Sequence, residues 1–197
     1  LETIGYKTKK AKAEVEASID RLIYYAGWSD KYQQVFGTIN PVSSSHFNFS
    51  MPEPMGVVNV WAPEERPLLG LVSVMAPVIV GGNTCVILAS EKYPLSAISF
   101  AEVLNSSDVP GGVVNILTGF KNELLEHMTT HKDVNAFFYT DPDIEQGKRK
   151  QIDENATLNL KRVRRKPVED WLSEEAQSPY YITDFQETKT TWHPVGL

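Results

Sequence analysis

Apolar residues near the start of the chain recur at the spacing of an amphipathic helix. Side chains three or four positions apart share one face of a helix, and Gly27, directly after the last of them, is typical of a helix end. The pattern therefore predicts an amphipathic helix over residues 13–26. The positions on its apolar face are Val15, Ile19, Leu22, Ile23 and Ala26.

The next segment, residues 35–51, lacks a helical period. Two runs that contain β-branched and aromatic residues, 35–39 and 46–50, flank a polar stretch at 40–45. This arrangement is typical of two strands joined by a turn, so we expect a β-hairpin here.

After Pro54, short apolar runs alternate with helical stretches. A repeated strand–helix order is typical of a doubly wound parallel sheet, whose crossovers are right-handed by default. Prolines open three of the helical stretches, where a first turn needs no N–H donor. We expect strands at 57–62, 84–88, 113–117 and 136–139, and helices that begin at Pro67, Pro94, Lys121 and Pro142.

The last part of the chain follows a different pattern. We expect a strand at 160–166, a short helix at 167–177 and a strand-like tail at 181–192. The run from Leu68 to Ile79 is apolar all round, which is typical of a helix buried against a sheet.

The composition is that of an ordinary globular protein, with 42% hydrophobic and 22% charged residues. A net charge of −6 argues against nucleic acid as the main partner, because phosphate binding needs a positive field. The longest apolar run, Pro67–Val80, is too short to span a membrane. The single Cys85 excludes an internal disulfide and favours a reducing, cytoplasmic location. Since the chain begins with Leu1, we expect a fragment of a longer protein.

Several segments, in the same order, resemble the aldehyde dehydrogenase superfamily. Tyr24–Tyr32 resembles the end of the helix before the family's oligomerisation hairpin, and Glu53–Val60 resembles the opening of its first cofactor-domain strand. Asn159–Val163 matches the run before the family's catalytic glutamate, and Phe185–Trp192 resembles its C-terminal strand. Further matches are Pro67–Leu69, Gly82–Thr84, Ser90–Glu91, Pro94–Ala97 and Pro110–Gly119.

The resemblance implies an α/β fold with the family's Rossmann-like parallel sheet, its oligomerisation hairpin and its C-terminal strand. A short linker stands where the family has its catalytic domain. The chain is thus similar to the degenerate second domain of the sixteenth aldehyde dehydrogenase family, whose members carry two copies of the fold. The implied parts are an N-terminal helical segment (1–34), the hairpin (35–52), a Rossmann-like cofactor-type domain (53–167), the linker (168–181) and the C-terminal oligomerisation strand (182–197).

All three catalytic positions that the resemblance implies are altered. The family's nucleophilic cysteine falls in the segment that the linker replaces, and Cys85 lies in an apolar strand without an obvious activating group. Glu65 stands at the oxyanion-donor position, where a carboxylate can only accept. Lys166 stands at the general-base position, and an ordinary lysine is protonated at neutral pH. We therefore expect no catalytic residues and no enzymatic activity in this chain.

The cofactor positions are altered less completely. Leu88 supplies no donor in the run that matches the family's ribose-binding motif. At the expected pyrophosphate-binding helix start, Asp141 would cap the helix but repel phosphate, and Pro142 lacks an N–H. We expect NAD to bind weakly or not at all. What remains of a cofactor site would consist of Ser90, Glu91 and Thr140.

Two further patterns carry weaker chemistry. His127 and His131 lie four positions apart, one turn after Glu123, which is metal-ligand spacing on a helix; a solvated helix face has the same pattern, and we expect no metal site. The basic clusters 148–150 and 161–166 are compatible with phosphate-rich partners, but such charge runs usually face solvent.

Functions from different classes follow from this reading. We expect a non-catalytic structural module that assembles through unpaired sheet edges, as a homo-oligomer, by intramolecular pairing with a complete aldehyde dehydrogenase domain, or with other proteins. The alternative is a part of an NAD-dependent enzyme that oxidises aldehydes to carboxylic acids at an active site in an upstream domain. A regulatory module that still binds a nucleotide is the third interpretation.

Overall fold

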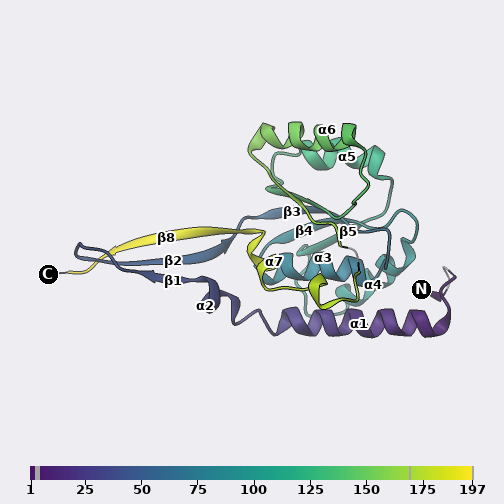
Figure 1. Ribbon diagram of the computed structural model, residues 1–197, viewed down its shortest axis with the longest axis horizontal. Helices are drawn as coiled ribbons and strands as arrows, with labels where there is room; N and C mark the ends of the chain where they lie inside the picture. Colours follow the sequence, from purple (N-terminus) through teal and green to yellow (C-terminus); the bar gives the residue numbers. More distant parts are fainter. Residues whose placement is uncertain (3–4, 169, 197) are drawn as a thin grey trace.

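A five-stranded parallel sheet forms the body of the protein, and a three-stranded antiparallel arm projects from it (Figure 1). The computed structural model describes residues 1–2, 5–168 and 170–196. The strand order in the body is β5-β4-β3-β6-β7, and each neighbouring pair is parallel. The expected α/β fold class is confirmed. The body strands are β3 (Val57–Trp61), β4 (Thr84–Leu88), β5 (Val114–Leu117), β6 (Ala136–Tyr139) and β7 (Arg162–Arg165).

Helices cover both faces of this sheet (Figure 1). On one face, α3 (Leu69–Val80) and α4 (Leu95–Asn105) contribute to the largest core cluster. On the other face, α5 (Lys121–Thr130) and α6 (Gln146–Ala156) cover Trp61, Phe137 and Tyr139. Because both faces are covered, the central strands are apolar almost without interruption.

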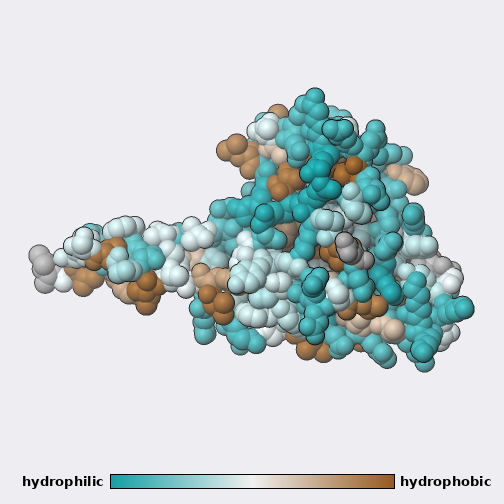
Figure 2. Space-filling view, viewed as in Figure 1, coloured by the Kyte–Doolittle hydropathy of each residue, from teal (hydrophilic) through white to brown (hydrophobic). Residues whose placement is uncertain are grey.

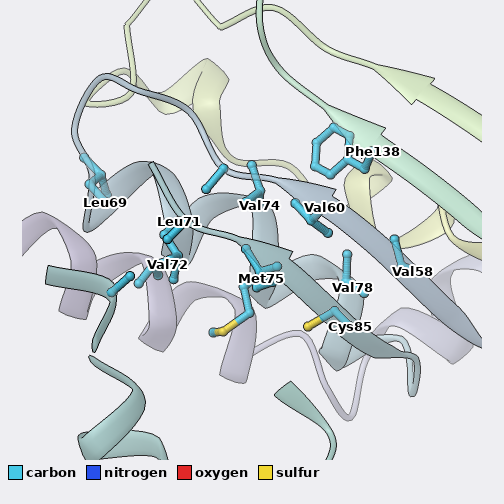
Figure 3. Close-up of a cluster of buried hydrophobic side chains, with 14 of the residues drawn as sticks. Val58, Val60, Leu69, Leu71, Val72, Val74, Met75, Val78, Cys85 and Phe138 are labelled. Carbon is cyan, nitrogen blue, oxygen red and sulfur yellow. The ribbon is translucent and has the colours of Figure 1, made fainter. Parts of the chain in front are cut away.

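The core between the sheet and α3 is built from small and branched side chains. Figure 3 shows Val58, Val60 and Cys85 of neighbouring strands directed toward Val78 and Met75 of α3. Residues 69–78 of α3 are all buried, which confirms the expectation of a helix buried against the sheet.

The helix expected at 13–26 is present but longer. The prediction that its apolar residues form the buried face is wrong. Helix α1 (Thr8–Ala26) packs against α3, yet Val15, Ile19 and Ile23 are 40%, 51% and 64% exposed. Its buried positions are Ala11, Glu14, Ser18, Arg21 and Tyr25. The Glu14 carboxylate accepts hydrogen bonds from the start of α3, and Arg21 donates to distant backbone carbonyls, which explains why the polar face lies inside.

The arm consists of the hairpin and the tail of the same chain. Strand β2 (His46–Pro54) lies between β1 (Thr38–Asn40) and β8 (Gln186–Pro194) and is antiparallel to both. The strand expected at 35–39 is largely wrong, because residues 32–36 form the short helix α2 (Tyr32–Phe36). The tail strand likewise begins later than expected, since α7 (Tyr180–Thr183) precedes it.

Two other helix predictions are corrected by the structure. The helix expected at 167–177 is absent from the described part of that stretch except for a single 3₁₀ turn, η3 (Glu174–Ala176); residue 169 lies outside the described residues. The helix expected from Pro142 begins four residues later, at Gln146. Among the described helices, none is both long and apolar enough to cross a membrane.

Candidate functional site

The carboxyl ends of the parallel strands bring several charged residues together at one edge of the sheet. Glu64 follows β3, Ser90 and Glu91 follow β4, Lys121 opens the helix after β5, and Asp141 follows β6. In open α/β sheets, this edge is where ligands bind. It is therefore the first candidate for a functional site in this chain.

The Glu64 carboxylate gathers the hydrogen-bond donors at this edge. It accepts hydrogen bonds from the hydroxyl of Ser90 at 2.7 Å and from the backbone amides of Glu91 at 3.3 Å and Lys92 at 3.1 Å. The ammonium group of Lys121 lies 2.7 Å from it. Burial alone would raise the pKa of Glu64, but the hydrogen bonds from Lys121 and Ser90 outweigh it and lower the pKa. Glu64 is thus an ionised carboxylate whose hydrogen-bond partners are groups of the same chain.

Lys121 links the other acidic residues of this edge. Its ammonium lies 3.8 Å from the Asp141 carboxylate and 5.9 Å from the centre of the Trp61 ring. Its backbone amide donates to the Glu91 carboxylate. A cation at a helix N-terminus is unfavourable for the helix dipole. The nearby carboxylates of Glu64, Glu91 and Asp141 compensate for it. We name Glu64, Glu91, Lys121 and Asp141 the edge network.

The structure divides the three residues expected to remain from a cofactor site. Ser90 is buried and Glu91 is exposed, and both belong to the surroundings of Glu64. Thr140 is buried on the other side of β6, with Phe138, and lines a small cavity near Lys166. The sequence missed Glu64 and Lys121. The signal for Lys121 was its place in a first helical turn, where the helix dipole favours acidic neighbours.

Asp141 does not have the role predicted for it. Its carboxylate accepts a hydrogen bond from the backbone amide of Asp143 at 3.1 Å, so it stabilises a turn rather than the start of α6. Leu88 is fully buried in the core beneath α5 and α6. Glu65 is exposed.

Lys166 lies in a small cavity between the sheet and the linker. Its ammonium stacks on the ring of Tyr181. Burial lowers the pKa of Lys166 to about 8, although Asp184 opposes the shift, so the lysine is less basic than the sequence suggested. The cavity encloses about 10 Å³, which is room for about one water molecule. The Thr140 hydroxyl has no hydrogen-bond partner among the described residues.

Cys85 is buried in the core of the body. Its side chain is fully inaccessible, and burial raises the pKa of the thiol to about 12. A thiol of this kind is neutral at physiological pH and is not a nucleophile.

The remaining candidates contribute no assembled site. Within residues 1–2, 5–168 and 170–196, His, Cys, Asp and Glu side chains do not form a group of three that could hold a metal. The ring of His131 accepts a hydrogen bond from the amide of Asp133 at 3.3 Å. Lys148 and Lys150 pair with neighbouring glutamates on the surface of α6.

Comparison with known proteins places this fold and sequence in one group. The model of the aldehyde dehydrogenase family matches residues 1–164. Retinal dehydrogenase 2 of Gallus gallus is 37% identical over 151 residues, which are 76% of this chain and 28% of that protein. Omega-crystallin of Enteroctopus dofleini is 33% identical over 142 residues, 71% of this chain and 28% of that protein. The chain thus spans less than a third of these relatives' length.

Solved structures agree with the sequence comparison. PnpE from Pseudomonas sp. WBC-3 has a TM-score of 0.71 and 29% identity, and covers 78% of this chain and 30% of its own. The aldehyde dehydrogenase of Bacillus cereus, solved as an NAD⁺ complex, has a TM-score of 0.70 and 28% identity over 77% of this chain and 30% of its own. On the family match, the sequence relatives and the shared fold, this chain belongs to the aldehyde dehydrogenase family.

Proposed function

We propose that this chain is a non-catalytic assembly module of the aldehyde dehydrogenase family. The observation that carries the proposal is that the polar groups at the carboxyl edge of the sheet already bind one another. The donors that a nucleotide would use there already serve the Glu64 carboxylate. The edge network carries three carboxylates and a single lysine, so this edge repels phosphate rather than attracts it. These residues do not fit a dinucleotide.

The residues at the family's catalytic positions support the same proposal. Glu65 can accept hydrogen bonds but cannot donate one to an oxyanion. Lys166, with a pKa near 8, is still mostly protonated at neutral pH. Cys85 is buried and neutral. Each of the three chemical roles would need a different residue from the one present.

The arm supports the assembly role. Residues alternate between the two faces of a strand, and one face of the arm carries Ile39, Phe47 and Met51, which are 73%, 46% and 39% exposed. Figure 2 shows brown, hydrophobic atoms along the arm. An exposed apolar sheet face with an unpaired edge strand favours association. The arm would join a second copy or a complete aldehyde dehydrogenase domain.

The opposite arm face is mostly polar, with Trp192, which is 57% exposed, as its large apolar side chain. The Asn40 amide donates to Asn48 at 2.6 Å and to the Ser50 hydroxyl at 2.8 Å, and the Ser50 and Thr190 hydroxyls are 2.8 Å apart. The Asn40 bonds join β1 to β2, and the Ser50–Thr190 bond joins β2 to the tail strand β8, so side-chain bonds as well as backbone pairing hold the three strands in register.

The alternative is that the chain serves an NAD-dependent enzyme formed by the longer protein. Solved relatives include NAD complexes, and this is the observation that favours it. The name of omega-crystallin is not that of a dehydrogenase, and membership of a fold family does not determine activity. A cytoplasmic location fits both functions.

Two measurements test the proposal. Calorimetric titration with NAD should give no binding heat; a dissociation constant near 1 μM, about −8 kcal/mol, would contradict it. Light scattering should show self-association that Ile39→Glu abolishes. Leu158→Glu is the matched control, because Leu158 is 61% exposed on the body. A wild-type chain that stays monomeric at high concentration, alone and with a complete aldehyde dehydrogenase, would refute the assembly role.

A further inference from the structure

Four hydrogen-bond donors from two separate segments converge on the carboxylate of Glu64. The hydroxyl of Ser90 lies 2.7 Å from Oε2, and the backbone amide of Lys92 lies 3.1 Å from the same atom. The amide of Glu91 lies 3.3 Å from Oε1, and the ammonium of Lys121 lies 2.7 Å from it. Successive backbone amides beside a cation form a concave surface that binds anions. The two oxygens of Glu64 are thus held as those of a bound oxyanion would be.

The segment that carries three of these donors is fixed by groups other than Glu64. The Ser90 hydroxyl accepts a hydrogen bond of 3.1 Å from the backbone amide of Tyr93, which positions it in the turn before α4. The Glu91 carboxylate accepts a hydrogen bond from the backbone amide of Lys121 and so ties this turn to the start of α5. The hydroxyl and the two amides would therefore keep their positions without Glu64.

The fourth donor, Lys121, is restrained in a similar way. Its side chain is only 13% exposed. The ammonium lies 3.8 Å from the Asp141 carboxylate and 5.9 Å from the centre of the Trp61 ring. Donors that are supported by their own neighbours are the mark of a binding site, because such a site exists before its ligand arrives.

The loop that carries Glu64 is anchored independently of the Glu64 carboxylate. This loop joins β3 to α3, and at its far end the carboxylate of Glu14 accepts hydrogen bonds from the amides of Leu68 and Leu69 at 3.1 Å and 3.4 Å. The Glu64 side chain is 23% exposed. Rotation about its own side-chain bonds would therefore carry the carboxylate into solvent while the loop stays anchored.

The charge balance selects the class of ligand. Lys121 is the cation in contact with Glu64, and the carboxylates of Glu91 and Asp141 lie nearby. Lys92 contributes its backbone amide, and its side chain is exposed. A monoanion in place of Glu64 restores the present charge, whereas a phosphate group carries up to two negative charges near neutral pH and meets more repulsion.

We propose that Glu64 is an intramolecular plug in an oxyanion-binding site, and that this site takes a small carboxylate monoanion when Glu64 swings out. The plug is an autoinhibitory contact, because a carboxylate on the same chain competes at a high effective concentration with carboxylates in solution. This inference rests on the proposed function, in which the same edge of the sheet binds no dinucleotide.

Thermal unfolding in acetate at neutral pH tests the plug. Glu64→Ala empties the site, and acetate at about ten times its dissociation constant should raise the melting temperature of this variant by about 3 °C relative to chloride of the same ionic strength. The wild type and Glu64→Gln, whose side chains still fill the site, should show no such rise. Phosphate should stabilise Glu64→Ala less than acetate does.

A second substitution locates the bound acetate. Lys121→Met in the Glu64→Ala background should abolish the acetate response, whereas the matched Lys148→Met, on the surface of α6, should retain it. If Glu64→Ala does not fold, as judged by circular dichroism, Glu64→Ser replaces it under the same criteria.

Failure of the plug and failure of the proposed function give different results. An absent acetate response in Glu64→Ala, an equal response in the wild type, or a response that survives Lys121→Met overturns the plug. A stronger response to phosphate than to acetate overturns the assignment to a carboxylate. NAD binding by the wild type would instead refute the proposed function.

Discussion

The guanidinium of Arg21 donates a hydrogen bond of 2.7 Å to the carbonyl of Ala176, more than a hundred residues further along the chain. It also donates to the Ser73 hydroxyl at 2.6 Å and to the Trp171 carbonyl at 3.0 Å. Tyr25, one turn after Arg21 on α1, contacts Ser178 through its hydroxyl. The polar face of α1 therefore fastens the linker to the body.

Replacement of Arg21 should release this linker. Burial lowers the pKa of Arg21, and Arg21→Ala would leave buried carbonyl groups without donors, at a cost of about 2–4 kcal/mol in unfolding free energy. Urea denaturation measures the loss, and limited proteolysis should cut near residues 171–178. Lys9→Ala, on the exposed part of the same helix, is the control. Equal stability of both variants would mean that the linker does not depend on Arg21.

Glu64→Gln should destabilise the protein at neutral pH by about 1–2 kcal/mol, allowing for its partial exposure. Because the folded-state pKa of Glu64 is lowered, its contribution is present above the ordinary pKa of a glutamate and is lost as the pH falls through the folded value. The difference between the two proteins should therefore shrink toward acidic pH. Urea titrations at neutral and acidic pH test this, with the exposed Glu65→Gln as control. A pH-independent difference would argue against the network.

Lys166→Met should stabilise the protein, in contrast to Glu64→Gln. The folded-state pKa of Lys166 is about 8 against an ordinary value of 10.5, so the unfolded chain binds more protons between these values and wild-type stability rises with pH there. Below this window the charged lysine destabilises the fold, and Lys166→Met should be more stable by about 1 kcal/mol. Thermal melts across this window should show the advantage disappear as the pH approaches 10.5. A constant advantage would place the lysine in solvent.

Removal of the tail strand after Glu187 should expose the arm without disturbing the body. Ile182, Phe185 and Gln186 are buried, and Arg162 of β7 donates hydrogen bonds to Gln186 and Glu187, so the cut must follow them. Strand β2 would lose its partner β8, and amide hydrogen exchange should accelerate at Phe47–Ser50 but not in β3. Unchanged exchange in β2 would show that the hairpin holds its own structure.

Much of the body could be predicted from local pattern. Strands such as 84–88 and 136–139 are short apolar runs between turn residues, and their order along the chain is enough to indicate a parallel sheet. The start of α6 was misplaced because the turn residues Asp141 and Pro142 also suit a helix start. The helix at 32–36 was missed because one and a half turns carry no readable period.

The sequence by itself determined most of the strands and helices of the body, since apolar periodicity acts within a few residues. Only the tertiary structure decided which face of α1 is buried, because Glu14 and Arg21 find their partners at positions 68 and 176. The edge network was decided in the same way. Glu64 and Lys121 lie far apart in the chain and meet only because parallel strands deliver their carboxyl ends to one edge of the sheet.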